Sequence, residues 1–299
     1  MADIADTVAT TGTPTPRKRI KWEHVTDHAI LILGAMLMIV PIILALTTAT
    51  LPDLQIERQG LQFAIGDQFD DNVESALFQP GGFSGEVTGV SMLTNSLILG
   101  VGFALGKILV GMTAAYAIVY FRLRFGTFAF WIIFTTLLLP LEVRILPSYE
   151  VIVGMGLTNT YTGLIVPLIA SATATFFFRQ FFMSVPEELV EAARIDGAGP
   201  TKFFIDILVP LSRTMIAAMF IIMFVFGWNQ YLWPTLITTD EDMFTLVRGI
   251  RQIIQDQEGV NIPEYGRGIM LAMLAMAPPV LIVVFFQSWF VKGLTESDK

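Results

Sequence analysis

The sequence predicts an all-α membrane protein with six transmembrane helices, and three observations carry this prediction. Hydrophobic residues make up 54% of the 299 residues, charged residues only 15%, and the mean hydropathy is +0.66, which is far outside the range of soluble domains. The apolar runs are about 20 residues long and lack the alternation of a barrel strand, which selects helices. Lys and Arg are also unevenly distributed between the segments that join these runs.

Each predicted span is one of these apolar runs, with polar segments between them. Residues 1–26 are predicted to form a cytoplasmic tail, residues 27–291 a six-helix transmembrane domain with external loops at 52–89 and 237–266, and residues 292–299 a second cytoplasmic tail. The six spans are expected from about His28 to Leu51, Val90 to Tyr120, Thr127 to Leu146, Tyr161 to Phe182, Arg213 to Leu236 and Gly268 to Val291.

The orientation follows from the charges. With both termini in the cytoplasm, 12 of the 18 Lys and Arg residues lie in cytoplasmic segments and five in external ones, while Lys107 lies inside a span. The acidic residues divide into 11 inside and 15 outside, so the external segments together carry a net charge near −10. The positive-inside bias therefore predicts cytoplasmic termini, and the whole negative balance of the chain is external.

Composition also excludes several kinds of chemistry. A chain with so few charges is a poor candidate for a soluble enzyme or a nucleic-acid-binding protein. The absence of Cys removes disulfides, thiolate metal sites and cysteine catalysis. His24 and His28 lack further ligands nearby, so neither a metal site nor a catalytic residue is predicted. The stretch from residue 100 to 108 resembles a phosphate-binding loop, but it lies within a predicted span and is not expected to bind a nucleotide. Gly102 and Gly106 instead predict a helix-packing face.

The segment between the fourth and fifth spans has the pattern of two short helices. The spacing of Ser184 and Glu187 predicts a capping box at the start of the first helix, and Gly197 and Gly199 stop it. A second amphipathic piece is expected from about Thr201 to Leu208. Such helices can also lie on the bilayer surface or pack on their own helix bundle, and that alternative remains open from this pattern alone.

A longer motif in this segment points to a family. Glu191, Ala192 and Ala193, then Gly197, and then Ile207 and Pro210 resemble the EAA motif of the membrane subunits of binding-protein-dependent ABC importers, with Val209 where the family usually has Leu. The resemblance implies a type I ABC importer permease fold whose cytoplasmic coupling helices, within residues 184–210, dock on an ATPase subunit. The residues that it implies for ATPase coupling are Glu191, Ala192, Ala193, Asp196, Gly197, Ile207 and Pro210.

Three further stretches, residues 139–152, 170–200 and 227–243, are similar to permease subunits of bacterial glycerol-3-phosphate importers. The resemblance implies transport of sn-glycerol-3-phosphate or glycerophosphodiesters across the inner membrane by a multi-pass subunit that itself binds no cofactor. It implies a homologous second permease subunit, two ATPase subunits that hold ATP and Mg, a periplasmic or lipid-anchored binding protein, and contact with membrane lipid but not with nucleic acid. A sugar or polyol importer of the same family is the alternative substrate class.

A stand-alone secondary transporter is a competing class of function. Such a transporter needs an internal repeat, a broken-helix site or carboxylates within its spans to couple ions to transport. The sequence shows no repeat and places no Asp or Glu deep in a predicted span. Together with the EAA motif, these features favour a subunit of an importer.

Polar residues within or beside the spans are candidates for the substrate path. The residues singled out are Trp228, Asn229, Gln230 and Tyr231, together with Lys107 and Arg144. Aromatic faces and amides suit hydroxyl groups, an ammonium in mid-span needs a partner or water, and a guanidinium can bind phosphate through two hydrogen bonds. The alternatives are an aromatic belt at the interface for Trp and Tyr, and a salt bridge to another subunit for Arg144.

The acidic external face would repel a phosphorylated substrate from free solution, so delivery by a binding protein is expected. Arg248 and Arg251, in the loop between the last two spans, are the candidates for docking that protein. The alternative is a solvated loop in which these arginines have no special role.

Overall fold

The computed structural model describes residues 22–80, 87–121, 123–254 and 264–295, and within these ranges all regular structure is helical. The chain divides into two compact parts, residues 1–43 and 44–299, which are considered separately. Residues 1–21 of the predicted N-terminal tail and residues 296–299 of the predicted C-terminal tail lie outside the described ranges.

The first part contains most of helix α1 (Trp22–Thr48), whose segment Thr26–Thr48 is long and apolar enough to cross a membrane. Its side chains are exposed, including Leu33 at 71% and Leu37 at 72%. A helix of this length and hydropathy meets the requirement for a membrane span.

The second part consists of short and long helices that follow one another closely. In order they are α2 (Asp53–Gln59), α3 (Phe69–Phe78), α4 (Gly89–Tyr120), α5 (Gly126–Thr135), η1 (Thr136–Leu138), α6 (Leu141–Gly154), α7 (Tyr161–Ile165), η2 (Val166–Leu168), α8 (Ala172–Ser184), α9 (Glu187–Ile195), α10 (Pro200–Phe203), η3 (Phe204–Leu208), α11 (Val209–Leu211), α12 (Arg213–Trp228), α13 (Leu232–Ile237), η4 (Glu241–Met243), α14 (Leu246–Ile254) and α15 (Tyr265–Thr295).

Three helices of the described chain are long and apolar enough to span a membrane, and the number rises to six when each of three bent helix pairs counts as one span. The long segments are Thr26–Thr48, Gly89–Tyr120 and Tyr265–Trp289. The pairs are Gly126–Leu138 with Val143–Gly154, bent by 102°; Tyr161–Leu168 with Ala172–Ser184, bent by 50°; and Pro200–Leu211 with Arg213–Trp228, bent by 74°.

The third, fourth and fifth predicted spans are therefore present, but each is interrupted at a position that the sequence did not predict. The third breaks at Leu139, which is extended because the following Pro140 excludes the helical conformation from the residue before it. The fourth breaks before Ser171, whose hydroxyl accepts from the Ala174 amide at 3.2 Å and starts α8. The fifth ends at Trp228, and the chain resumes as α13 at Leu232.

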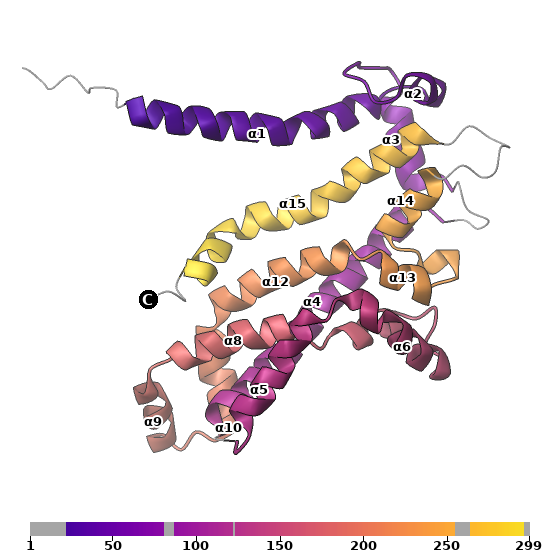
Figure 1. Cartoon of the computed structure of the whole chain (residues 1–299). Helices are drawn as coiled ribbons and strands as arrows, with labels where there is room; N and C mark the ends of the chain where they lie inside the picture. The colour runs from indigo at the N-terminus through magenta and orange to yellow at the C-terminus, as the bar shows by residue number, and fades with distance from the viewer. Residues whose placement is uncertain (1–21, 81–86, 122, 255–263, 296–299) are drawn as a thin grey trace, which may run out of the picture. The chain divides into compact units, whose positions relative to one another are not determined.

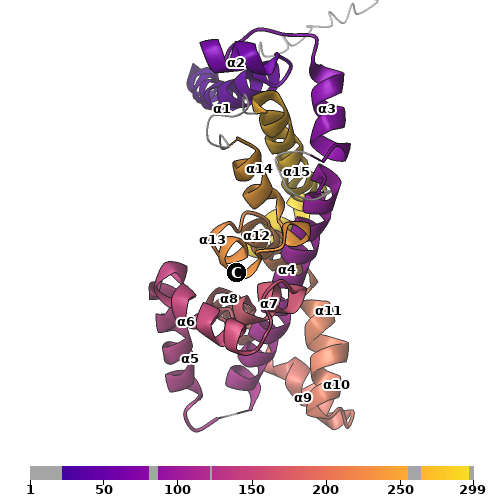
Figure 2. The ribbon, with the colours of Figure 1, turned by 90° about the vertical axis from the view of Figure 1, so that its right-hand side faces the viewer.

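Helix α4 is the centre of the packed second part. It packs against α8 and α12, and α12 also packs against α15, as Figures 1 and 2 show. The fully buried side chains in these contacts include Phe103 of α4, Phe178 of α8 and Phe224 of α12. Burial of such rings between the helices fixes their arrangement, which in turn places the polar residues of α4.

The predicted small-residue face of α4 is confirmed. A Cβ atom on Gly102 would lie 2.6 Å from the Ile165 side chain, and one on Gly106 would lie 2.4 Å from that of Ile169. Further along the same helix, a Cβ atom on Gly111 would lie 2.5 Å from the Cβ atom of Ala174. The absence of side chains along this face lets α7 and α8 approach the backbone of α4 closely.

The predicted loop 52–89 contains two helices that the sequence did not suggest, and polar contacts tie them to the start of α15. The Asp53 carboxylate accepts from the Gly266 amide at 2.7 Å. The buried Arg267 guanidinium donates to Glu264 at 2.7 Å and to the backbone oxygen of Gln79. These contacts fix both ends of the α2 to α3 segment against one end of α15.

Candidate functional site

A cavity of about 440 Å³ lies among α4, α6, α8 and α12. Its lining combines apolar side chains with hydroxyl, amide and cationic groups. The lining residues are Phe103, Lys107, Thr136, Leu137, Leu139, Pro140, Arg144, Leu168, Ala170, Ser171, Ala172, Thr173, Ile222, Met223, Phe226 and Gln230.

The three interruptions of the predicted spans all open onto this cavity. Leu139 and Pro140 form the break before α6, Ala170 and Ser171 the break before α8, and Gln230 follows the end of α12. Non-helical backbone at membrane depth is tolerated where it lines a cavity or is buried in protein, since it has polar groups to satisfy. In secondary transporters, substrate sites lie at breaks of this kind.

Two cationic side chains line the same cavity. Lys107 on α4 is only 8% exposed, and its Nζ lies 4.4 Å from the centre of the Phe103 ring. Arg144 is exposed and lies in the first turns of α6. Among the side chains that the structure describes, neither forms a salt bridge with a carboxylate. A cavity with two cations that are unpaired among the described carboxylates is suited to an anion.

The four candidates at the end of α12 and directly after it have separate environments. Gln230 is 9% exposed and lines the cavity, with its amide nitrogen 3.3 Å from the backbone oxygen of Phe226. Asn229 is exposed and donates to the backbone oxygen of Val225 at 2.8 Å. The structure therefore brings Gln230, but not Asn229, together with the two cations.

The two aromatic candidates lie away from the cavity. Trp228 is 3% exposed, its ring stacks on Phe224 with centroids 5.6 Å apart, and its Nε1 donates to the Ala275 oxygen of α15 at 3.2 Å. Tyr231 lies with its ring 5.0 Å from the Arg251 guanidinium. Trp228 thus joins α12 to α15, and Tyr231 contacts the predicted external loop.

Sequence reasoning missed the hydroxyl groups of the cavity, which belong to Thr136, Ser171 and Thr173. Ser171 and Thr173 belong to a run of small residues, and Ser171 has the spacing of a helix cap. Recognising the helix start at Ser171 would have located a break in the fourth span and, with it, one wall of the cavity.

The predicted coupling segment is a helix, a glycine turn and a second helical piece. Helix α9 ends in a Schellman motif, in which the amide of Ala198 donates to the Ala193 oxygen at 2.8 Å and that of Gly197 to the Arg194 oxygen at 3.0 Å. Gly197 has φ +73°, a backbone conformation that residues other than Gly rarely adopt. The prediction that Gly197 makes the turn is confirmed.

The start of α9 and the second piece differ from the prediction. Ser184 forms no capping box: its hydroxyl donates to the Phe181 oxygen at 2.7 Å, and Pro186 occupies the cap position without a side-chain hydrogen bond. The second piece runs from Pro200 to Leu211 and includes a π-helical turn, Phe204–Leu208, just before Pro210. Proline cannot donate to a regular helix, which favours an irregular turn there.

Aromatic residues of α4 anchor this segment. The Tyr116 hydroxyl donates to the Pro200 oxygen at 2.8 Å, and the Tyr120 hydroxyl donates to the Phe182 oxygen at 3.2 Å. Of the motif residues, Ala193 is buried and Ile207 partly buried, whereas Glu191, Ala192, Asp196 and Pro210 are exposed. The segment is thus attached to the helix that carries Lys107 while most of the motif stays accessible.

The most exposed apolar side chain of the coupling segment was not among the predicted residues. Ile195, at the end of α9, is 86% exposed, and Leu189 in the same helix is 40% exposed. Exposed aliphatic side chains on a short helix are typical of a surface that another protein covers.

The two arginines of the predicted external loop have different surroundings. Arg248 stacks on the Phe244 ring, with its Cζ 3.6 Å from the ring centre, and donates to the Thr238 hydroxyl at 2.7 Å. Burial lowers the pKa of the Arg248 guanidinium, against the opposing effects of Tyr231 and Glu241. Arg251 is exposed. Arg248 therefore holds the loop together, and Arg251 is the accessible cation.

Hydrogen bonds also hold the predicted external loop on the end of α4. The buried Asn95 amide donates to the backbone oxygens of Asp242 and Phe244 at 2.7 and 2.9 Å, and its oxygen accepts from the Tyr161 hydroxyl at 2.6 Å. The neighbouring Ser96 hydroxyl accepts from the Leu246 amide at 2.7 Å. Helix α4 therefore contacts this loop at one end and the coupling segment at the other.

Comparison with known proteins defines the class of protein. Residues 107–296 match the family of binding-protein-dependent transport system inner membrane components, and the chain belongs to this family. It is an inner-membrane permease subunit with the fold of an ABC importer permease. In fold, it is similar to a bacterial ABC transporter involved in import of the acidic polysaccharide alginate, with a TM-score of 0.73 at 20% identity over 93% of this chain and all of that one.

Particular relatives are similar over nearly their whole length. The chain is 48% identical over 279 residues to the sn-glycerol-3-phosphate transport system permease protein UgpE of Brucella melitensis, covering 92% of this chain and 97% of that protein. It is 47% identical over 273 residues to the protein of the same name from Yersinia pestis, with 91% and 96% covered.

Proposed function

We propose that this permease subunit forms half of the translocation pathway of an ATP-driven importer for sn-glycerol-3-phosphate or its diesters. The observation that carries the proposal is the placement of Lys107 and Arg144 in one cavity at the helix breaks, with no carboxylate paired to either among the described side chains. Relatives that share nearly half of their residues with this chain are named for transport of that anion.

The cavity chemistry supports a small phosphorylated polyol. The phosphate would bind between the Lys107 ammonium and the Arg144 guanidinium, the second of which can offer two parallel hydrogen bonds. The hydroxyls of Ser171 and Thr173 and the amide of Gln230 line the same space and are suited to the glycerol hydroxyls. A substrate in this position touches α4, α6, α8 and the end of α12 together.

The coupling segment and the predicted external loop support the other subunits of the proposed complex. Glu191, Ala192 and Asp196 remain exposed beside the projecting Ile195, so α9 presents a mixed polar and apolar surface to an ATPase subunit. ATP and Mg would be held by two such subunits, and a homologous permease would complete the pathway. With cytoplasmic termini, the loop that carries Arg251 faces outward, where a binding protein delivers the substrate.

The test is ATP-dependent uptake of labelled sn-glycerol-3-phosphate by the reconstituted complex with its binding protein. Each charge-assisted hydrogen bond contributes about 1.5–3 kcal/mol, so Lys107→Met and Arg144→Gln are each expected to reduce kcat/KM about 10- to 150-fold. The control is Arg58→Gln, which removes an exposed cation that does not line the cavity and is expected to leave uptake unchanged. Uptake of a neutral sugar in place of the phosphate, unaffected by either cavity variant, would contradict the proposal.

A further inference from the structure

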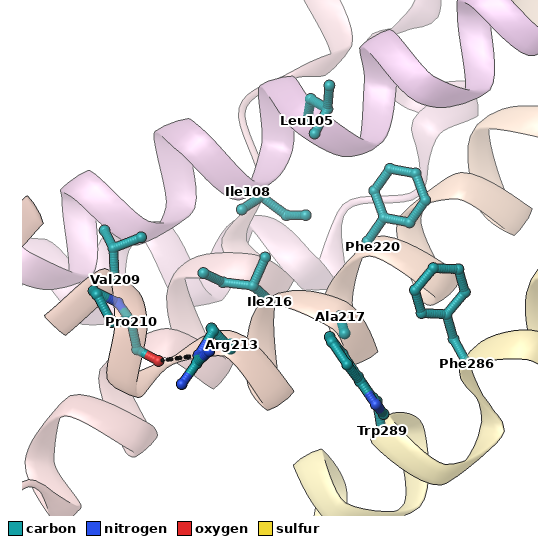
Figure 3. A pocket seen from close by; sticks show the side chains of 10 residues that line it. All are labelled: Leu105, Ile108, Val209, Pro210, Arg213, Ile216, Ala217, Phe220, Phe286 and Trp289. Carbon is teal, nitrogen blue, oxygen red and sulfur yellow. Dashed lines mark hydrogen bonds between the residues drawn. The ribbon is translucent and has the colours of Figure 1, made fainter.

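A second cavity, of about 700 Å³, lies between α4, α12 and α15 and has a different chemistry from the first. Nine of its ten lining residues are apolar. The residues are Leu105, Ile108, Val209, Pro210, Arg213, Ile216, Ala217, Phe220, Phe286 and Trp289, and we refer to them as the α12 groove (Figure 3).

The α12 groove lies on other faces of its helices than the translocation cavity. On α4 it is lined by Leu105 and Ile108, whereas the translocation cavity is lined by Phe103 and Lys107. At 100° per residue, these two pairs lie on nearly opposite sides of the helix. The groove is therefore separate from the proposed substrate path and open to whatever surrounds the transmembrane helices.

The charge in the α12 groove is concentrated at one end. Among the described residues that line it, Arg213 alone is charged, and no acidic side chain of the described chain forms a salt bridge with it. Its Nε donates to the Pro210 oxygen at 3.0 Å, which holds the exposed guanidinium beside the groove (Figure 3). The terminal nitrogens of a guanidinium held in this way are suited to a phosphate.

The apolar walls extend from this cation along the helices. Phe220 lies two turns from Arg213, about 10 Å along α12, which is comparable with the roughly 15 Å of hydrocarbon in one leaflet. Figure 3 shows the rings of Phe220, Phe286 and Trp289 across the groove from Arg213 and Pro210. Trp289 is 48% exposed, and a Trp near a helix end is typical of the depth of lipid headgroups.

We propose that the α12 groove binds an anionic phospholipid, with an acyl chain against the apolar walls and the headgroup phosphate on Arg213. An anionic headgroup complements the single cation, and an acyl chain complements nine apolar residues. A single cation near an anionic lipid surface contributes about 1 kcal/mol, which corresponds to about a fivefold preference for an anionic over a zwitterionic lipid.

The test uses the full complex in bilayers that contain brominated phosphatidylglycerol or brominated phosphatidylcholine, since bromine on an acyl chain quenches nearby tryptophan. Subtracting the signal of Trp289→Phe isolates Trp289 from the other four tryptophans of this chain and from those of the partner subunits. Half-quenching is expected at about a fivefold lower fraction of phosphatidylglycerol than of phosphatidylcholine. Arg213→Gln is expected to abolish this preference, whereas the control Arg124→Gln, at an exposed cation outside the groove, keeps it.

A second variant separates loss of the site from loss of the fold. Ala217→Phe fills the groove without changing its charge, so it is expected to reduce quenching of Trp289 by both lipids while the complex still assembles. Equal quenching by the two lipids in the unmodified complex would overturn the proposal, as would an undiminished preference in Arg213→Gln. Protection of Trp289 from both lipids would show that a protein helix covers the groove, which overturns it as well.

Discussion

The turn at Gly197 gives a prediction whose size follows from backbone geometry. Gly197 has φ +73°, and no atom lies within 4 Å of the position that a Cβ would occupy, so a side chain there meets no clash. The cost of Gly197→Ala is therefore the cost of the left-handed conformation itself, about 1–2 kcal/mol. A cost of this size lowers the equilibrium constant for forming the native turn about 5- to 30-fold.

The matched control is two residues further along. Gly199 also has open space around its Cβ position, but its φ of −70° is ordinary for any residue. Gly199→Ala is therefore expected to be nearly neutral. Gly197→Asn is expected to lie between the unmodified chain and Gly197→Val, because Asn tolerates the left-handed conformation better than a β-branched residue.

The assay is the ATPase activity that the loaded binding protein stimulates in the reconstituted complex, together with the amount of ATPase subunit retained on the purified permease. Gly197→Ala is expected to reduce the stimulated activity, by at most about 30-fold. Gly197→Val is expected to reduce it further. Equal effects of Gly197→Ala and Gly199→Ala, or equal effects of Asn and Val at position 197, would refute the backbone explanation.

Three further predictions concern packing, the predicted external loop and pH. Gly111→Ala places a Cβ 2.9 Å from the Thr175 amide nitrogen, and overpacking of this kind costs about 1–3 kcal/mol, so the thermal midpoint of the solubilised chain is expected to fall. Asn95→Ala removes two hydrogen bonds to the loop, worth about 1 kcal/mol each, and hydrogen exchange in residues 242–246 should accelerate about 30-fold. Burial and the charge of Glu264 raise the pKa of Asp53 above 3.8, although the hydrogen bond from the Gly266 amide opposes them. The folded state therefore binds the carboxyl proton of Asp53 more tightly than the unfolded state, so the free energy of unfolding declines as pH rises from 3.8 through the raised pKa. Asp53→Asn keeps the acceptor oxygen and is expected to raise the thermal midpoint at neutral pH, with the gain vanishing towards pH 3.8.

Each of these predictions has a control in the chain. Gly34→Ala, at a helical position with open space, is expected not to lower the thermal midpoint. Thr94→Ala, at the exposed residue beside Asn95, should leave loop exchange unchanged, and Glu57→Gln should not reproduce the pH dependence of Asp53→Asn. An Asn95→Ala chain with unchanged exchange would show that other contacts hold the loop, and a pH-independent gain in Asp53→Asn would contradict the titration.

The spans were predictable from the sequence because apolar length is a direct requirement of the bilayer. The close approach of Gly102 and Gly106 to the neighbouring helix was predictable for a similar reason, since small residues four apart leave a flat face. The turn at Gly197 followed from the preference of Gly for helix ends. In each of these cases a local pattern determines the structure by itself.

The helix breaks were harder to predict because apolar composition continues through them. Pro140 and Ser171 are each compatible with a helix start and with a tolerated irregularity in a membrane helix, and only tertiary packing decides between them. The cavity depends on these breaks, so its hydroxyl groups were missed, although Lys107, Arg144 and Gln230 were identified as isolated polar residues. Trp228 was predicted to line the substrate path but packs in the helix core, because the indole N–H of a tryptophan can find a hydrogen-bond acceptor in either place.

The most direct test of the central claim is a structure of the assembled complex trapped with sn-glycerol-3-phosphate inside the membrane. The account predicts that the phosphate lies within ion-pair distance, about 4 Å, of both the Lys107 ammonium and the Arg144 guanidinium. A substrate held elsewhere in the pathway, with Lys107 and Arg144 paired to carboxylates of the partner subunits, would contradict it.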